Sequence, residues 1–464
     1  MSKRIALMVV LFALILPAFP VAAQTTAGPI YIVQPGDTLS SIASRFDVSL
    51  NDLMAANGLS DPNRLSAGQE LVIPGLEGVS GVLLTEVVQF GDTYRSLLRR
   101  TQVPEALLRR LNRLVSPNEL YVGVSLIVPQ ESGQTRLNSR AALSNGESLL
   151  ELAVRQNTDP WTLAQINQLA GTWSALPGNV LYFSSETPAQ AASGLPPVFQ
   201  QVEVGPLPLE QGATAVIRAQ TPAGVTLSGL LVDHPLRFFS EADGSQVALQ
   251  GVHALLEPGP YPLRLEATLP DGSQQSFEQM ILIVSGNYPQ EDLYVESNTI
   301  DPLVTEPENQ QILSLTAAAT PTRYWRGIFR SPAFYPDCFT SRYGNRRTYH
   351  GLNTETEIQG FHTGLDFCGG EGLPITAPAA GQVVFAGPLT VRGNATLIDH
   401  GQGVYSGFWH QSSIQVTVGQ MVEQGQVIGI VGGTGRVTGA HLHWEVWVNG
   451  VQVNPMAWLE RSFP

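Results

Sequence analysis

One sequence pattern recurs three times in the first 184 residues at a constant spacing. Its markers are three glycines and three asparagines, each set 55 residues apart: Gly36, Gly91 and Gly146, and Asn57, Asn112 and Asn167. The first copy has an apolar strand, a Gly-Asp turn, apolar residues at helical spacing and a second apolar strand. A fixed period of this length indicates a repeated supersecondary unit. Each copy, at 31–74, 85–129 and 140–184, is therefore expected to fold as strand, helix, helix, strand.

The amino-acid composition indicates several small domains rather than one core. A chain of 464 residues is long enough for about three or four domains, and 45 Gly and 33 Pro predict many turns and linkers. The net charge of -14 leaves no basic stripe that could contact phosphates. The composition therefore argues against nucleic acid as a partner.

The N-terminus, residues 1–23, has the organisation of a secretory signal peptide. Two basic residues precede an apolar run from Ile5 to Leu16, and small residues lead to Ala23, after which cleavage is expected. The alternative is an uncleaved anchor, although the run is short for a membrane span of about 20 residues. The mature chain is therefore expected outside the cytoplasm and without a membrane span. There, a disulfide between its two cysteines, Cys338 and Cys368, is favoured over a thiolate metal ligand.

The middle of the chain has a different character. Residues 202–285 contain alternating apolar runs bounded by Pro, Gly and Asp-Gly turns, which is the pattern of an antiparallel β-sandwich. We find no catalytic pattern in this segment. In the linker that follows, 286–327, Thr305 and Glu308 are spaced as a capping box ahead of an apolar stretch, which predicts one helix.

Six of the eight histidines lie between His350 and His443. Near the C-terminus, the stretch HLHWEVWV has high strand propensity, and alternation places His441, His443 and Glu445 on one face of the strand with apolar residues on the other. Two imidazoles at i and i+2 lie about 7 Å apart at Cα. This spacing would let one imidazole bind a metal while the other reaches the water that the metal activates.

The sequence GFHTGLDFCGG supplies a second half of such a site, because His362 and Asp366 are four residues apart. Its glycines favour a loop that enters a strand, where an i, i+4 pair shares one face. With His443, these residues make three nitrogen and oxygen ligands and leave a fourth tetrahedral position open, the pattern of catalytic zinc. Each motif alone is common in long proteins. His350, expected in a loop, and His400, expected to hold a turn, have no matching ligand role.

The order of motifs across residues 328–460 resembles peptidase family M23, the LytM-type, lysostaphin-like metallopeptidases. The motifs are TSRYGNRR, HTGLD, APAAGQVVFAG, GNATLIDHGQGVYSGFWHQ, VGQMVEQGQVIGIVGGTGRVTGAHLHWEV and NPMAW. The resemblance implies that His362, Asp366 and His443 bind Zn²⁺ and that His410 and His441 are the two catalytic histidines. Where the family usually has Tyr-x-His-Leu, this chain has FWHQ, a departure that concerns the wall of the substrate groove and therefore substrate preference.

The first repeat resembles a LysM domain, a βααβ fold whose ligands are N-acetylglucosamine-containing glycans such as peptidoglycan and chitin. The later copies depart from that pattern, since Phe90 replaces Pro35, Tyr94 replaces Leu39, and Glu147 replaces the turn aspartate. For these copies, glycan binding and a role as packed spacers are both open.

Together these resemblances predict a multidomain fold with α+β LysM repeats, an all-β sandwich and a mainly antiparallel β metallopeptidase domain. The expected function is a secreted, cell-wall-associated zinc endopeptidase that hydrolyses the peptide cross-bridges of peptidoglycan. The alternatives are a non-catalytic LytM-like activator or scaffold of other wall hydrolases, and a purely glycan-binding surface protein, which would leave the histidine cluster unexplained. The expected segments are the signal peptide 1–23, repeats 31–74, 85–129 and 140–184, the sandwich 202–285, the linker 286–327 and the metallopeptidase 328–464.

Overall fold

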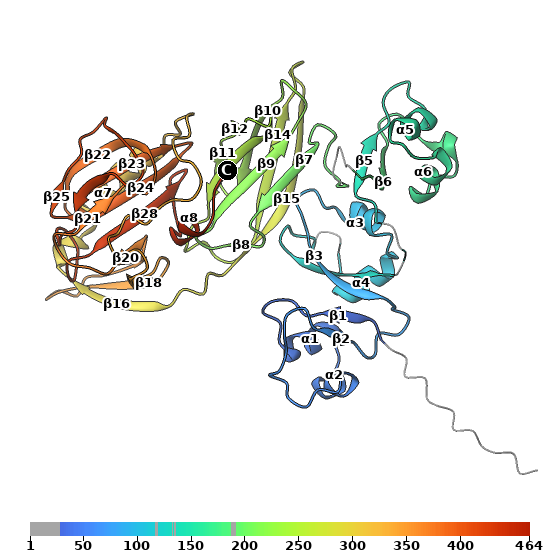
Figure 1. Cartoon of the computed structure of the whole chain (residues 1–464), viewed down its shortest axis with the longest axis horizontal. Helices are drawn as coiled ribbons and strands as arrows, with labels where there is room; N and C mark the ends of the chain where they lie inside the picture. Colours follow the sequence, from blue (N-terminus) through green and yellow to red (C-terminus); the bar gives the residue numbers. More distant parts are fainter. Residues whose placement is uncertain (1–27, 117–118, 132, 134–135, 187–191) are drawn as a thin grey trace, which may run out of the picture. The chain divides into compact units, whose positions relative to one another are not determined.

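The structure is a computed structural model that describes residues 28–464 except 117–118, 132, 134–135 and 187–191 (Figure 1). The predicted signal peptide lies outside the described residues. The described residues divide into two compact units, one within 28–84 and 129–131, the other within 85–128 and 133–464. Within the described part of the chain, no helix is long and apolar enough to cross a lipid bilayer.

The first unit contains the first repeat. Strands β1 (Ile30–Ile32) and β2 (Glu70–Val72) pair antiparallel, and helices α1 (Leu39–Phe46) and α2 (Leu50–Ala56) connect them. Helix α1 begins after Thr38 because the Thr38 side chain accepts a hydrogen bond from Ser41 N, while Ser41 Oγ accepts one from Thr38 N. The apolar positions at helical spacing in α1 are buried and form the core of this small fold.

The second and third copies have the same order of elements. They consist of β3 (Val82–Val87), α3 (Tyr94–Thr101), α4 (Glu105–Asn112) and β4 (Ser125–Gln130), and of β5 (Ser139–Ala142), α5 (Leu149–Arg155), α6 (Pro160–Ile166) and β6 (Val180–Phe183). In every copy the marker asparagine hydrogen-bonds, through its side chain, to both backbone groups of one residue in the last strand. The pairs are Asn57 with Val72, Asn112 with Ile127, and Asn167 with Tyr182. This contact explains why asparagine recurs at this position, because its side chain joins the end of the second helix to the last strand of the repeat.

Two sheets form the middle of the chain. The first has the order β11-β10-β14-β15-β8 and the second β12-β13-β9-β7. The strands are β7 (Gln201–Gly205), β8 (Leu209–Glu210), β9 (Thr214–Gln220), β10 (Thr226–Leu231), β11 (His234–Leu236), β12 (Phe239–Ser240), β13 (Gln246–Gly251), β14 (Gly259–Thr268) and β15 (Gln274–Val284). Apolar residues from both sheets share one core, as in a β-sandwich.

The segment after the sandwich is folded onto the C-terminal part of the chain. It contains β16 (Gln290–Val295), which pairs parallel with β18 (Arg346–Gly351), and helix α7 (Pro302–Thr316). The predicted capping box at Thr305 and Glu308 is wrong. The helix begins earlier because Asp301 accepts a hydrogen bond from Leu303 N and Pro302 occupies the first helical position.

The C-terminal part is built on one large antiparallel sheet with the strand order β17-β20-β28-β24-β23-β22-β26 and β29 paired with β28. The remaining elements are β17 (Phe339–Ser341), β19 (Glu357–Phe361), β20 (Leu365–Phe367), β21 (Pro374–Thr376), β22 (Gly381–Leu389), β23 (Gly393–Gly401), β24 (Val404–Gln411), β25 (Ser413–Ile414), β26 (Met421–Val422), β27 (Val427–Ile430), β28 (Leu442–Val448), β29 (Val451–Val453) and α8 (Met456–Glu460). The predicted fold class, with α+β repeats, an all-β sandwich and an antiparallel C-terminal domain, is confirmed.

Candidate metal and active site

The site forms where β28 lies between β20 and β24 (Figure 1). In the register of the sheet, Asp366 of β20 is opposite His443 of β28, so both side chains lie on the same face. The expected alternation along β28 is present. Leu442, Trp444 and Val446 pack in the main core, while His443 lies on the other face.

Three buried side chains place their ligand atoms within contact distance of one another. His362 Nε2 is 3.0 Å from Asp366 Oδ1, His443 Nδ1 is 2.7 Å from the same oxygen, and the two nitrogens are 3.1 Å apart. Ligand atoms of a tetrahedral zinc, with bonds near 2.0 Å, are about 3.3 Å apart. The donor set of two imidazoles and one carboxylate also suits zinc. The three ligand atoms are therefore close enough together, and of the right kind, to hold a metal ion.

Hydrogen bonds on the outer side of each imidazole determine which nitrogen faces inward. His362 Nδ1 lies 2.7 Å from the backbone oxygen of Arg342, so it carries the proton and Nε2 is free to bind a metal. His443 has the opposite tautomer, because its Nε2 lies 3.2 Å from Glu445 Oε1. Carboxylate and carbonyl partners of this kind orient metal-binding histidines.

The other two predicted residues lie beside this triad. His441 Nε2 is 3.3 Å from Asp366 Oδ1, and its Nδ1 is 2.8 Å from the Gly439 oxygen. The ring of His410 is centred 5.2 Å from that of His441 and 5.9 Å from that of His443. The structure thus brings all five predicted site residues together.

His410 reaches the site through an unusual backbone conformation. Trp409 is opposite His443 in the sheet, so strict alternation would send the His410 side chain to the opposite face. Instead, His410 has a φ of +64°, which breaks the alternation. Its Nδ1 hydrogen-bonds to the Thr434 oxygen at 2.8 Å, which orients the ring. A positive φ at a non-glycine residue is costly and is concentrated at functional sites.

Burial and neighbouring charges perturb the titration of the site. Burial, followed by the positive charges of His443 and His441, lowers the pKa of His410 to about 3. Burial opposes ionisation of Asp366, but the close contacts of its carboxyl with His362, His441 and His443 hold its pKa well below its usual range. Asp366 is therefore a carboxylate at neutral pH, as a metal ligand must be.

Glu445 is a site residue to which the sequence analysis assigned no role. It is fully buried, and its carboxylate accepts hydrogen bonds from His443 Nε2, Thr363 Oγ1 and, at 2.7 Å, Trp447 Nε1. The alternation of side chains along β28 had already placed Glu445 on the same strand face as His441 and His443, and this pattern could have identified it as a site residue. A buried carboxylate that holds a ligand histidine contributes to metal affinity through that histidine.

Two ion pairs from the segment before the C-terminal sheet support the site. Arg347 lies beside the candidate metal ligands, 3.9 Å from Asp366 Oδ2, and donates to Glu291 of β16 at 3.2 Å. Glu308 of α7 accepts hydrogen bonds from the backbone N and the guanidinium of Arg392. The oxygen of Arg392 in turn accepts from His410 N at 2.9 Å. The segment expected as a linker therefore helps to hold the face that carries the candidate site.

The five residues open onto a groove with a volume of about 1090 Å³. Its lining includes Asn309 and Leu313 of α7 as well as Trp409. Cys338 and Cys368 form a disulfide, with their Cα atoms 5.4 Å apart, that joins the ends of β17 and β20 near Asp366. The cysteines therefore clamp the site rather than bind a metal.

Two histidines outside the site differ from expectation. His400 is buried in β23, where its ring contacts Ala380 O and Ser406 Oγ, so it holds the sheet rather than a turn. His350 lies in β18 rather than in a loop, and its ring stacks on Tyr294. Neither residue is close enough to the triad to be among the metal candidates.

Comparisons with known proteins agree with this geometry. Residues 360–455 match peptidase family M23, and residues 31–74 and 87–129 match the LysM domain. The chain is 44% identical over 96 residues to the DD-carboxypeptidase/endopeptidase Mpg of Neisseria meningitidis, which covers 21% of this chain and 22% of that protein. It is 43% identical over 95 residues to the peptidoglycan DD-endopeptidase ShyA of Vibrio cholerae, and this match covers 20% of this chain and 22% of that protein. The chain thus spans about a fifth of the length of these relatives.

A solved structure from Pseudomonas aeruginosa, described as a peptidase M23, is 27% identical and covers 55% of this chain and 96% of that one, with a TM-score of 0.41. The fold and the site define a protein with a candidate metal site of two histidines and a carboxylate on an antiparallel sheet. The family matches are more specific. The chain carries a peptidase family M23 domain and LysM domains.

Proposed function

We propose that this protein is a secreted zinc-dependent endopeptidase that hydrolyses peptide cross-bridges of peptidoglycan. The observation that carries the proposal is the convergence of His362, Asp366 and His443 on one point, with His410 and His441 beside it. Relatives of the M23 domain include peptidoglycan DD-endopeptidases, which supports the substrate class. The apolar N-terminal run and the LysM domains support an extracytoplasmic, cell-wall location.

Zinc held by His362, Asp366 and His443 would polarise a substrate carbonyl and lower the pKa of water to about 7. We assign proton transfer from the attacking water to His441, because its Nε2 lies beside the ligand cluster and its Nδ1 is fixed by Gly439. His410 is assigned to the oxyanion or to proton delivery to the leaving amine, since its ring lies close to the ligands, centred 5.9 Å from that of His443, without being one of them.

The LysM repeats would concentrate the enzyme on its substrate. Binding of a repeat to glycan makes the encounter of the peptidase with a nearby cross-bridge effectively intramolecular. This tethering raises the local substrate concentration without altering the chemistry at the zinc site. Deleting residues 31–184 is therefore expected to reduce binding to insoluble peptidoglycan while a small soluble peptide is still cleaved.

Digestion of purified sacculi tests the proposal. Released muropeptides, sized by mass spectrometry, should carry new amino termini, and one zinc per chain should be measured in the purified protein. Asp366→Ala should lose both zinc and activity, whereas Asp337→Ala, which removes an exposed carboxylate of the same domain, should lose neither. New reducing sugar ends would contradict peptidase action, and no cleavage at full zinc occupancy would favour the non-catalytic activator.

A further inference from the structure

The second repeat differs from the first at the turn that follows its first strand. In the first repeat, a Cβ placed on Gly36 would have no atom within 4 Å, so the turn is open. The equivalent position in the second repeat is Gly91, where a Cβ would lie 2.5 Å from the side chain of Leu195. The backbone oxygen of Gly91 also accepts a hydrogen bond from Gly194 N at 2.7 Å. Other parts of the same unit therefore cover this turn.

The side chain of Gln279, from β15 of the sandwich, fills the space next to the covered turn. Its Oε1 accepts a hydrogen bond from Gly91 N at 2.8 Å. Its Nε2 donates to the backbone oxygen of Asp92 at 2.9 Å and to that of Leu120 at 3.2 Å. The carboxamide is surrounded by one N–H donor and two carbonyl acceptors. These partners fix its orientation, because the amide oxygen must face the N–H and the amide nitrogen must face the carbonyls. The side chain thus joins the turn to the loop that precedes β4.

Contacts around Gln279 make this a built interface. Val122, in the loop that precedes β4, exchanges backbone hydrogen bonds with Met280 and Leu282 of β15, both at 2.8 Å. The ring of Phe90 packs edge-on against Phe277, with centroids 5.3 Å apart. Residues on both sides of Gly91 are therefore fixed to the sandwich strand that carries Gln279.

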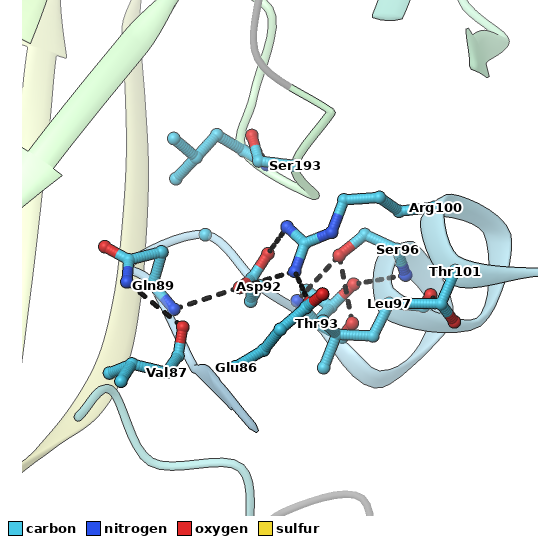
Figure 2. A network of polar contacts seen from close by, with 12 residues as sticks. Glu86, Val87, Gln89, Asp92, Thr93, Ser96, Leu97, Arg100, Thr101 and Ser193 are labelled. Carbon is cyan, nitrogen blue, oxygen red and sulfur yellow. Dashed lines mark hydrogen bonds and ion pairs between the residues drawn. The ribbon is translucent and has the colours of Figure 1, made fainter. Parts of the chain in front are cut away.

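The turn is also fixed from within the repeat. Figure 2 shows the Asp92 carboxylate facing the guanidinium of Arg100, at 2.7 Å, while its other oxygen accepts from Gln89 N. Glu86 contacts the same guanidinium. Asp92 is only 1% exposed, so these contacts support the turn from the interior of the repeat. Without the Gln279 side chain, the Gly91 N–H and the backbone oxygens of Asp92 and Leu120 would be preorganised to bind a ligand.

We propose that Gln279 is an internal ligand that closes the second repeat to glycans and leaves the first repeat as a glycan-binding module. The acetamido group of an N-acetylated sugar has a carbonyl acceptor and one N–H donor, so it matches the carbonyl contact of Gln279 and one of its two N–H contacts, and the two groups compete for these backbone partners. The second repeat then acts as a connector that holds the sandwich. This proposal rests on the glycan targeting proposed above.

Hydrogen–deuterium exchange of the full chain, measured by mass spectrometry with and without a soluble N-acetylglucosamine tetramer, tests the proposal. At saturation, the oligosaccharide should slow exchange in peptides that contain Gly36 and leave those that contain Gly91 unchanged. In Gln279→Ala, loss of three hydrogen bonds should speed exchange around Gly91 by about tenfold or more. Gln274→Ala, an exposed glutamine on the same strand, is the matched control and should exchange as the wild type does.

Protection of the Gly91 peptides by the oligosaccharide in the wild-type chain would overturn the proposal, because the turn would then be open in solution. Unchanged exchange around Gly91 in Gln279→Ala would also overturn it. If the oligosaccharide protects neither turn, glycan targeting by the first repeat fails. In that case the comparison of Gln279→Ala with Gln274→Ala still decides whether Gln279 holds the second repeat closed.

Discussion

Replacement of Glu445 by glutamine should weaken zinc binding although Glu445 is not a metal ligand. The carboxylate accepts from His443 Nε2 at 3.2 Å and from Trp447 Nε1 at 2.7 Å, and Thr363 contacts it as well. All of these partners act as donors, and a carboxylate has acceptor sites for each of them. A glutamine has the same shape but only one accepting atom. Its NH₂ group must therefore face a donor, either His443 or Trp447.

The expected loss follows from that mismatch. Leaving the buried Trp447 N–H without an acceptor would cost about 1 to 3 kcal/mol. The NH₂ group therefore faces His443 and Thr363, whose hydroxyl can also accept, and His443 loses the partner that sets its tautomer. Loss of the outer partner of a metal-binding histidine typically weakens metal affinity by about 10- to 100-fold, or about 1.4 to 2.7 kcal/mol. We expect the zinc affinity of Glu445→Gln to fall within that range.

Competition with a chromophoric zinc chelator at pH 7.5 measures the affinity directly. Glu423→Gln, which changes an exposed glutamate of the same domain, is the control and should bind zinc as the wild type does. Circular dichroism of the metal-free proteins checks that both variants are folded. A zinc affinity of Glu445→Gln within twofold of the wild type, in a folded protein, would refute the assigned role.

Other predictions concern catalysis, acid stability and the repeats. His441→Ala should keep zinc and lose activity on sacculi by about 10²- to 10⁴-fold. His443→Ala should lose zinc and activity together. If His441→Ala lost zinc and His443→Ala kept it, His441 would be the metal ligand and His443 the proton-transfer residue. Burial lowers the pKa of His400 to about 4, below an ordinary value of about 6.5, so only the unfolded chain takes up a proton between these values. This histidine alone should therefore cost the wild type about 3 kcal/mol of folding free energy as the pH falls from 6.5 to 4, and urea titrations of His400→Gln should show a loss that is smaller by about that amount. Asn167→Ala removes the side chain that pairs with both backbone groups of Tyr182, and should destabilise the third repeat by about 2 to 4 kcal/mol, measured as faster amide exchange in that repeat alone.

Local patterns in the sequence were sufficient for the fold class and for the location of candidate ligands. The spacing of the repeats predicted the strand, helix, helix, strand order because the apolar positions in α1 recur at helical spacing and must be buried on one side. Alternation along β28 predicted which face carries His443, because successive side chains of a strand point to opposite faces. The metal and catalytic roles of the five residues stay predictions until zinc and activity are measured.

The start of α7 shows the limit of local reasoning. The spacing of Thr305 and Glu308 satisfied the capping-box pattern, but Asp301 and Pro302 provided a better start one turn earlier. Glu308 is instead buried against Arg392, more than 80 residues away in the sequence. A capping motif describes only the nearest backbone groups, so it cannot register a distant cation that competes for the same carboxylate.

The sequence by itself determined the number and order of the repeats, the alternation of β28 and the residue types at the site, because each depends on neighbours a few positions away. Tertiary structure alone decided that Asp366 is opposite His443, that a positive φ at His410 turns its ring into the groove, and that Gln279 fills the turn at Gly91. Each of these contacts depends on sheet register or on packing between distant segments. No local spacing encodes them, since their energy comes from groups that meet only in the folded chain.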